Sequence, residues 1–135
     1  MGRIGFGVFM ILHGLVHLLY AGHSRKLFEL QSGLPWPDGS WLFAKSIGEE
    51  RTRLLATITY IVAALGFVVS GLAILFNLTF WPVVLIGSTL FSGLIIILFW
   101  DGTMRKLADQ GGGGLLINIA ILVVTLFLQT GKFDL

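Results

Sequence analysis

Cysteine is absent from this 135-residue chain, and charge is scarce, with 12% of the residues being Asp, Glu, Lys or Arg. The lack of cysteine excludes disulfides, thiolate-ligated zinc, iron–sulfur clusters and cysteine nucleophiles. A soluble domain usually carries about 25% charged residues. The chain therefore has too little polar surface to face water on all sides. Its formal net charge of +2 gives no indication of a nucleic-acid partner.

In place of charge the chain has long apolar segments. Hydrophobic residues make up 56% of it, and the mean hydropathy is +0.91. Four apolar runs cover approximately residues 4–22, 54–76, 78–100 and 115–129. A helix that crosses a bilayer needs about 20 apolar residues, and backbone groups in lipid must be hydrogen-bonded within their own segment. We expect one all-α domain over residues 1–135, a polytopic bundle of four transmembrane helices whose immediate partner is the lipid bilayer.

The basic residues predict how this bundle is oriented. With four spanning helices, seven Lys and Arg residues fall on one side of the membrane, whereas Arg3 and Lys132 fall on the other. The positive-inside rule then predicts a multi-pass protein of the plasma membrane with both termini outside and both long connections in the cytoplasm. Residues 23–52 form the longer connection. Because Trp36 and Trp41 favour the headgroup level, this segment either lies on the membrane surface or is an ordinary loop anchored there.

Small and weakly polar residues predict which helix faces turn inward, because they let membrane helices approach closely. The second run carries such residues at steps of three and four: Thr59, Ala63, Gly66, Ser70, Ala73 and Asn77. The first run carries a polar stripe flanked by Gly7 and Gly14: Met10, His13, His17 and Tyr20. We expect these faces to form the bundle interior and the aliphatic faces to contact lipid.

Two histidines in the segment LHGLVHL indicate a candidate site. His13 and His17 are four residues apart, so they share one face of a helix. Histidine is uncommon in membrane helices and usually faces the interior of the bundle. By depth, Asp101 and Asn118 fall level with His17 on two other helices, and Ser92 lies deeper. The topology therefore predicts a polar pocket formed by these five residues in the half of the bundle next to the long connections.

Three interpretations of this cluster are compatible with the sequence. In the first, His17 and Asn118 form a structural hydrogen bond, since each side chain has a donor and an acceptor. In the second, the cluster binds a ligand or a proton, because imidazole titrates near neutrality and Asp101 could exchange protons with it. In the third, His13 and His17 hold a divalent metal or a haem. The pair has half of a zinc-type spacing without the Glu of H-E-x-x-H, so Asp101, Asn118 or solvent would complete a metal site, and a haem would require a His–Met pair or a dimer.

Three segments carry a resemblance to known proteins: LHGLVHLL in the first run, LIIILFWD closing the third and GLLINIAIL opening the fourth. They resemble small four-helix membrane proteins of bacteria and archaea for which no function is assigned. The first run, with Arg3 before it and His-Gly at its middle, and the C-terminal GKFDL are loosely similar to the DoxX group. That resemblance implies a link to quinone-dependent oxidation and to thiol stress. This chain departs from the group at His17, where a Lys often follows the His-Gly.

The function that these patterns favour is binding of a small lipophilic or protonatable, quinone-like ligand, with a redox system as its setting. His13 and His17 would bond the carbonyl or hydroxyl of the ligand, Asn118 would orient it, and Asp101 would set protonation at the mouth. One alternative is a subunit of a transporter or channel, which would need a homo-oligomer because four helices are few. Another is an accessory subunit of a larger membrane complex. The sequence leaves open whether the protein is an enzyme.

Overall fold

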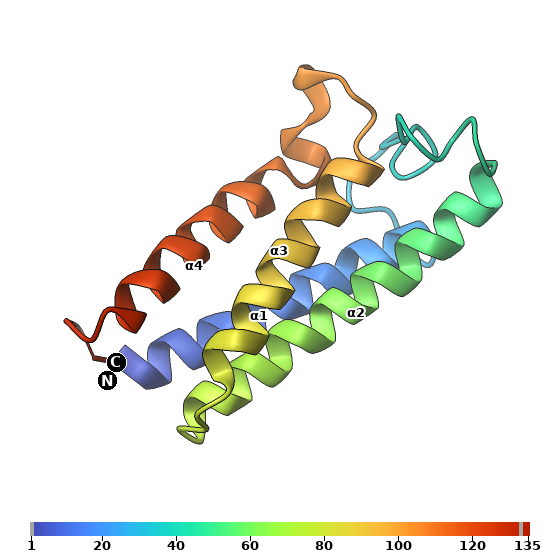
Figure 1. Ribbon diagram of the computed structural model, residues 1–135. Coiled ribbons are helices and arrows are strands. Elements are labelled where there is room, and N and C mark those ends of the chain that lie inside the picture. The colour runs from blue at the N-terminus through green and yellow to red at the C-terminus, as the bar shows by residue number, and fades with distance from the viewer. Residues whose placement is uncertain (1, 133) are drawn as a thin grey trace.

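The computed structural model describes residues 2–132 and 134–135, so Met1 and Phe133 of the GKFDL segment lie outside the described residues. Four long helices follow one another along the chain (Figure 1): α1 (Gly2–Ser24), α2 (Glu49–Leu75), α3 (Trp81–Phe99) and α4 (Gly113–Gln129). A 3₁₀ turn, η1 (Met104–Lys106), and a kinked turn, η2 (Ala108–Gly112), whose backbone is non-helical at Gln110 and Gly111, precede α4. The described residues contain no strand, and the predicted all-α four-helix bundle is confirmed.

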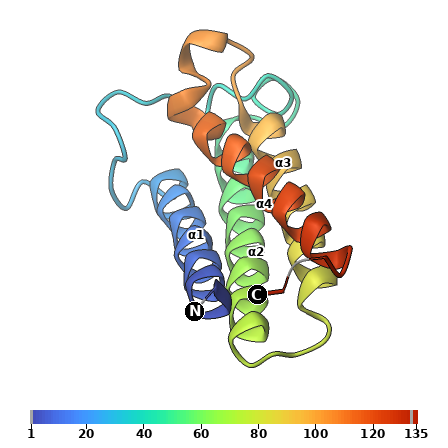
Figure 2. The same cartoon turned by 90° about the vertical axis from the view of Figure 1, so that its left-hand side faces the viewer.

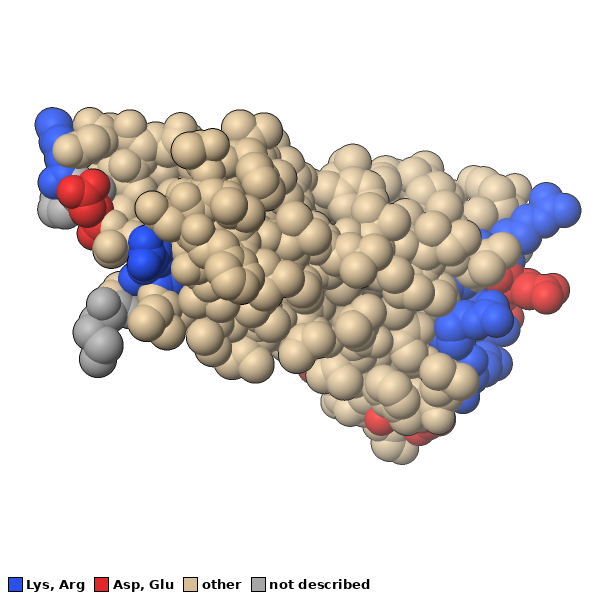
Figure 3. Space-filling view, turned by 90° about the horizontal axis from the view of Figure 1, so that it is seen from below, with Lys and Arg blue, Asp and Glu red and all other residues tan. Residues whose placement is uncertain are grey.

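Each helix is long and apolar enough to cross a membrane, if η2 is counted with α4. The termini and the short α2–α3 turn lie at one end of the molecule, here called the terminal end (Figure 1). The connections 25–48 and 100–112 lie at the other, the loop end. On the face seen in Figure 3, charged side chains gather at these two ends and leave an uncharged belt between them. The chain is therefore a multi-pass membrane protein.

Helix α2 begins earlier than the apolar run that predicted it, at Glu49 instead of near residue 54. Its first turn is polar, and hydropathy does not register such a turn. Glu49 and Glu50 are stabilised there because acidic side chains complement the positive N-terminus of a helix. Thr52 adds a hydrogen bond from its hydroxyl to the carbonyl of Gly48, at 2.7 Å. These residues add a polar turn to the helix before its apolar segment begins.

Two helices end in the same left-handed capping motif. Asn77 has φ 56° after α2, and Lys26 has φ 59° after α1. In each case the next amide donates to a carbonyl five residues back, from Leu78 to Ala73 and from Leu27 to Gly22. Glycine usually occupies this position and asparagine is the common substitute. The sequence therefore signals the end of α2, but Lys26 carries no such signal for α1.

Glycines set the distance between α1 and α2. A Cβ atom on Gly71 would lie 2.6 Å from the carbonyl oxygen of Gly7, and one on Gly14 would lie 2.9 Å from that of Ala64. On another face of α2, Gly66 lies against Ser88 of α3. The small residues of the second run thus serve two neighbours, and Gly71 makes the closest approach to α1. Side chains could not be accommodated at these crossings without moving the backbones apart.

The bundle is open along one side. Contacts run in sequence from α1 to α2, α3 and α4, whereas no Cα atom of α1 comes within 8 Å of a Cα atom of α4. Figure 2 shows α4 crossing obliquely in front of α2 and α3 instead of running alongside α1. Two apolar clusters fill the interior. The cluster nearer the loop end includes Tyr60 and Phe99, and the cluster nearer the terminal end includes Met10, Phe67 and Leu85.

We expect Gly71→Leu to lower the free energy of unfolding by about 2 kcal/mol or more, because an overpacked crossing forces the backbones of α1 and α2 apart. Thermal unfolding in detergent measures this. The matched control is Gly87→Leu, at an exposed position of α3 where a Cβ atom would meet nothing within 4 Å. Equal melting temperatures for the two variants would show that the Gly7–Gly71 crossing does not hold α1 against α2.

Candidate functional site

Four buried polar side chains from three helices form one hydrogen-bonded network. His13 Nε2 lies 3.0 Å from Asn118 Oδ1, and Asn118 Nδ2 donates to Ser92 Oγ at 2.8 Å. Ser92 Oγ lies 2.6 Å from His17 Nε2, and His17 Nδ1 lies 2.9 Å from the carbonyl oxygen of His13. The network therefore starts and ends on His13, and it connects α1 with α3 and α4.

The acceptors in this network determine where each proton sits. The Asn118 and His13 carbonyl oxygens can only accept, so His13 carries its proton on Nε2 and His17 carries its proton on Nδ1. Because Ser92 accepts from Asn118, its own hydroxyl proton is available to His17 Nε2. Every bond then runs in one direction around the network with both imidazoles neutral. That charge state suits a site inside a membrane, where an isolated charge is costly.

The two imidazoles lie between the apolar clusters and contact both. His13 packs edge-on against Phe67, with ring centroids 4.7 Å apart, and the His17 ring lies 5.8 Å from that of Tyr60. Both histidines are at most 5% exposed. The prediction that they face the interior therefore agrees with the structure. The His13–Asn118 bond also joins α1 to α4, two helices whose backbones do not pack together.

Two cavities occupy the groove between α1 and α4, one on each side of the His13–Asn118 bond. The inner cavity has a volume of about 110 Å³, and its lining includes His13, His17, Tyr20, Tyr60 and Gly114. The outer cavity, nearer the terminal end, has a volume of about 290 Å³ and only apolar lining residues, among them Phe6 and Val124. Ile117 lines both cavities. The groove therefore contains an entirely apolar outer cavity and an inner cavity lined in part by His and Tyr side chains.

Tyr60 contributes a feature that the sequence did not indicate. Its side chain is 1% exposed, and its hydroxyl has no hydrogen-bond partner among the described residues. Burying an unpaired hydroxyl costs about 1–3 kcal/mol, so such a group suggests a missing partner. Tyr60 lines the inner cavity, as does Tyr20, and these are the two tyrosines of the sequence. No sequence signal singles out Tyr60, because a Tyr within an apolar run is usually a core residue.

Asp101 lies apart from the network, although the topology predicted it to be part of the pocket. It follows the end of α3 at Phe99, and its carboxylate accepts from the amide and hydroxyl of Thr103 and from Gln110 Nε2. Partial burial raises the pKa of this carboxyl, but those hydrogen bonds and the charge of Lys106 outweigh it, and the pKa lies below its ordinary value. Asp101 therefore organises the α3–α4 connection. None of its hydrogen bonds within the described residues reaches the histidines.

The pairing within the network also differs from the one expected. The depth argument placed Asn118 beside His17, whereas the structure pairs Asn118 with His13 and places Ser92 beside His17. The cause is the start of α4. The chain turns through η2 before this helix, with Gly111 at φ 109°, and α4 then begins at Gly113 and crosses obliquely. Counting residues from the end of an apolar run does not capture that offset.

The histidines do not present a shared metal-binding face. Three of their four ring nitrogens already have hydrogen-bond partners, which leaves only Nδ1 of His13. Over residues 2–132 and 134–135, no group of three or more His, Cys, Asp or Glu side chains could hold a metal ion. A metal bound by both rings would first have to break the network. The geometry therefore favours hydrogen bonding over metal ligation at this site.

No family model, curated protein or solved structure matches the chain. What the site can bind is therefore inferred from its geometry alone. The lining of the inner cavity includes Tyr60, whose hydroxyl has no partner among the described residues, and His13, whose Nδ1 takes no part in the network. Such a pair can hydrogen-bond a small polar group but provides no charge.

We expect Ser92→Ala to lower the free energy of unfolding by about 1–2 kcal/mol, because it removes the donor to His17 and the acceptor for Asn118 together. The control is Ser88→Ala, one turn earlier on α3, where the hydroxyl only donates to the Val84 carbonyl of its own helix. That variant should change stability by less than about 0.5 kcal/mol.

Nitrogen-15 spectra of the histidine-labelled protein give an independent measurement of the same network. The wild-type protein should show the Nε2–H form for His13 and the Nδ1–H form for His17. Mixed or cationic imidazoles in the wild-type protein, or equal destabilisation by the two serine substitutions, would contradict this arrangement of protons.

Proposed function

We propose that this protein binds a small lipophilic molecule with a quinone-like polar head, which enters the inner cavity from the groove between α1 and α4. The unpaired hydroxyl of Tyr60, buried against that cavity, carries this proposal. A carbonyl oxygen on the head of the ligand would accept from it. Native structures leave few buried polar groups without partners, so a hydroxyl in this state beside a cavity is well explained by a ligand.

His13 is a second residue of the cavity that could hydrogen-bond a quinone-like ligand. His13 keeps an unshared pair on Nδ1 because Asn118 fixes its proton on Nε2. This nitrogen can accept a hydrogen bond from a hydroxyl. A ring that carries carbonyls in one oxidation state and hydroxyls in the other, as a quinone and its quinol do, would find a partner in each state. The network would thereby hold the imidazole in the form that the ligand needs.

The size of the cavity limits what enters it. Its volume of about 110 Å³ is well below the roughly 300–1,000 Å³ of sites that enclose whole drug-sized ligands. Only a head group fits, and the remainder would lie in the outer cavity or in lipid. The lining of the outer cavity is entirely apolar, which suits a hydrocarbon tail. A ligand dissolved in the bilayer could reach the site laterally without crossing water.

We expect Tyr60→Phe to weaken binding of a short-chain benzoquinone roughly fivefold or more, because it removes a hydrogen-bond donor from the cavity. Without ligand the same variant should be as stable as the parent or more stable, since the hydroxyl has no partner to lose. Calorimetric titration and thermal unfolding in detergent measure the two effects. Tyr20→Phe is the control, because the Tyr20 hydroxyl already contacts the carbonyl of Asp109, at 3.4 Å.

A second variant tests the place of binding. Gly114→Leu should abolish benzoquinone binding by filling the inner cavity, whose wall Gly114 forms. Unchanged affinity in both variants would overturn the proposal. So would a loss of stability in Tyr60→Phe with no change in affinity, because the hydroxyl would then have a partner other than the ligand.

The orientation in the membrane is part of this proposal. Seven basic residues belong to the loop end: Arg25, Lys26, Lys45, Arg51, Arg53, Arg105 and Lys106. Arg3 and Lys132 belong to the terminal end. The positive-inside rule supports a plasma-membrane protein with the loop end in the cytoplasm and both termini outside. The inner cavity would then lie toward the cytoplasmic leaflet.

Single-cysteine variants can test this orientation cleanly, because the chain has no cysteine of its own. In intact cells an impermeant thiol reagent should label Thr79→Cys, in the exposed α2–α3 turn at the terminal end. It should not label Ser46→Cys, in the exposed part of the loop end, until the cells are opened. The reverse pattern would refute the orientation, and labelling of both positions would refute the four-span topology.

A further inference from the structure

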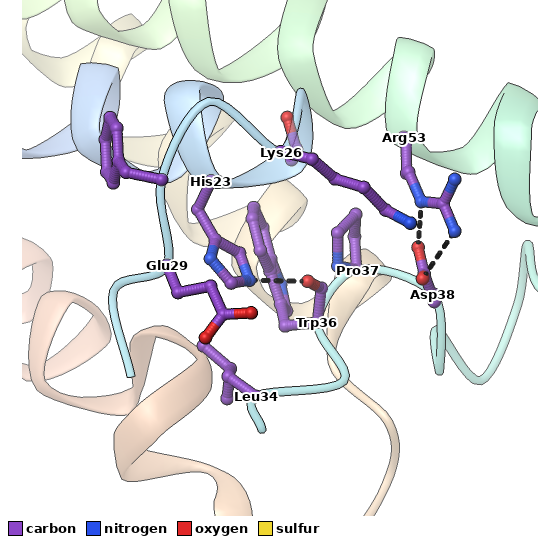
Figure 4. Close-up of a pocket in the computed structure, with 10 residues that line it drawn as sticks. His23, Lys26, Glu29, Leu34, Trp36, Pro37, Asp38 and Arg53 are labelled. Atoms are coloured by element: carbon purple, nitrogen blue, oxygen red, sulfur yellow. Dashed lines mark hydrogen bonds and ion pairs between the residues drawn. The ribbon is translucent and has the colours of Figure 1, made fainter. Parts of the chain in front are cut away.

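A separate, larger cavity lies at the loop end, where α1 ends and α2 begins (Figure 4). Its volume is about 320 Å³, and its lining includes His23, Lys26, Glu29, Trp36, Asp38 and Arg53. Its position is outside the apolar belt, at the level where the chain carries its charges and tryptophans. Trp41, nearby in the same connection, is 52% exposed, and exposed tryptophans favour the headgroup level of a bilayer.

Several polar groups around this cavity already have partners and serve the fold. Arg53 binds Asp38 through two bonds of 2.6 and 2.7 Å. His23 Nε2 lies 2.9 Å from the carbonyl oxygen of Trp36, while its Nδ1 accepts from the amide of Leu30 at 3.2 Å. These bonds fix the connection to both helices (Figure 4). They shape the cavity and occupy both ring nitrogens of His23 and both carboxylate oxygens of Asp38.

Three polar groups of the lining are left over. The side chains of Lys26 and Glu29, both exposed, form no hydrogen bond or ion pair within the described part of the chain. The indole Nε1 of Trp36 is likewise without a partner among the described residues, and Trp36 is 3% exposed. Figure 4 shows the Lys26 amino group directed toward the Asp38–Arg53 pair and the Glu29 carboxylate on the other side of His23. One cavity thus presents separate positive and negative positions.

We propose that this cavity binds the headgroup of a zwitterionic amino-phospholipid, with the phosphate at Lys26 and the primary ammonium at Glu29. An ammonium pairs with a carboxylate and a phosphate with a lysine, each through charge-assisted hydrogen bonds. Lipid is available at this level, and Leu27 and Phe28 offer exposed apolar surface next to Lys26, at 77% and 43% exposed, for an acyl chain. A soluble phosphoethanolamine ester has the same headgroup chemistry, so the experiment must separate the two sources. The site does not depend on the ligand proposed for the inner cavity.

The backbone at Lys26 makes the test sharp. Lys26 occupies the left-handed position that ends α1, with φ 59°, where glycine is the residue of lowest conformational cost. Lys26→Gly therefore removes the ammonium, and the backbone can keep its left-handed conformation at this position. The variant should fold as well as the parent, so that any loss of lipid reflects the missing charge. A lysine that served only to end the helix would be replaced by glycine without consequence.

The experiment is native mass spectrometry of the purified protein with phosphatidylethanolamine or phosphatidylglycerol of the same acyl chains. We expect the parent to prefer phosphatidylethanolamine. Lys26→Gly should weaken binding of both lipids roughly fivefold or more, because both carry the phosphate. Glu29→Gln should remove the preference and weaken only the ethanolamine lipid. Lys45→Ala is the matched control, because Lys45 is exposed on the same connection and does not line the cavity.

The remaining outcomes would overturn the proposal or show that the headgroup comes from a soluble ester instead of a lipid. Equal losses in Lys26→Gly and Lys45→Ala would reduce the effect to general attraction of basic residues to lipid and would overturn the site. An unchanged lipid preference in Glu29→Gln would overturn the assignment of the headgroup ammonium to Glu29. Glycerophosphoethanolamine that binds as tightly as the intact lipid would assign the cavity to a soluble amino-phosphate and overturn the lipid source. A site specific for the lipid should bind this soluble compound at least tenfold more weakly.

Discussion

The hydrogen bond between His13 and Asn118 is the contact on which the open side of this bundle depends. Helices α1 and α2 are held by glycines that bring their backbones together, but α1 and α4 have no such crossing. Side chains have to span the gap between them. A polar bond inside a membrane is worth only about 0.6–2 kcal/mol, yet it is directional. It fixes the distance of α4 from α1 and leaves space on both sides of itself, which becomes the two cavities of the groove.

The order of the network limits what its histidines can do. Its bonds run in one direction, from His13 through Asn118 and Ser92 to His17 and back to the His13 carbonyl. A proton added at Nε2 of His17 would face the hydroxyl proton of Ser92. The serine would then have to turn away, and the amide of Asn118 would have to rotate. No carboxylate of the network would compensate the new charge. A role as a fixed, neutral hydrogen-bonding surface therefore agrees better with this geometry than a proton relay that uses His17.

Much of this arrangement could be predicted from the sequence because it depends on residue type and helical period. Long apolar runs predict the four helices, and the spacing of His13 and His17 predicts their common inward face. The positions that sequence reasoning missed depend on offsets between helices. Asp101 falls outside the network because α3 ends before it, and Asn118 meets His13 because η2 shifts the start of α4. Tyr60 could not be singled out, since a missing hydrogen-bond partner is visible only when all neighbours are in place.

The two unpaired buried groups of the described residues are not scattered through the fold. The Tyr60 hydroxyl and the Trp36 indole nitrogen belong to rings whose centroids are 5.1 Å apart, in contact edge to face. Tyr60 lines the inner cavity, and Trp36 lines the cavity at the loop end. Random packing defects would have no reason to meet at one contact between two cavities. The unpaired groups therefore meet where the two proposed sites adjoin, and each belongs to a residue that lines one of the two cavities.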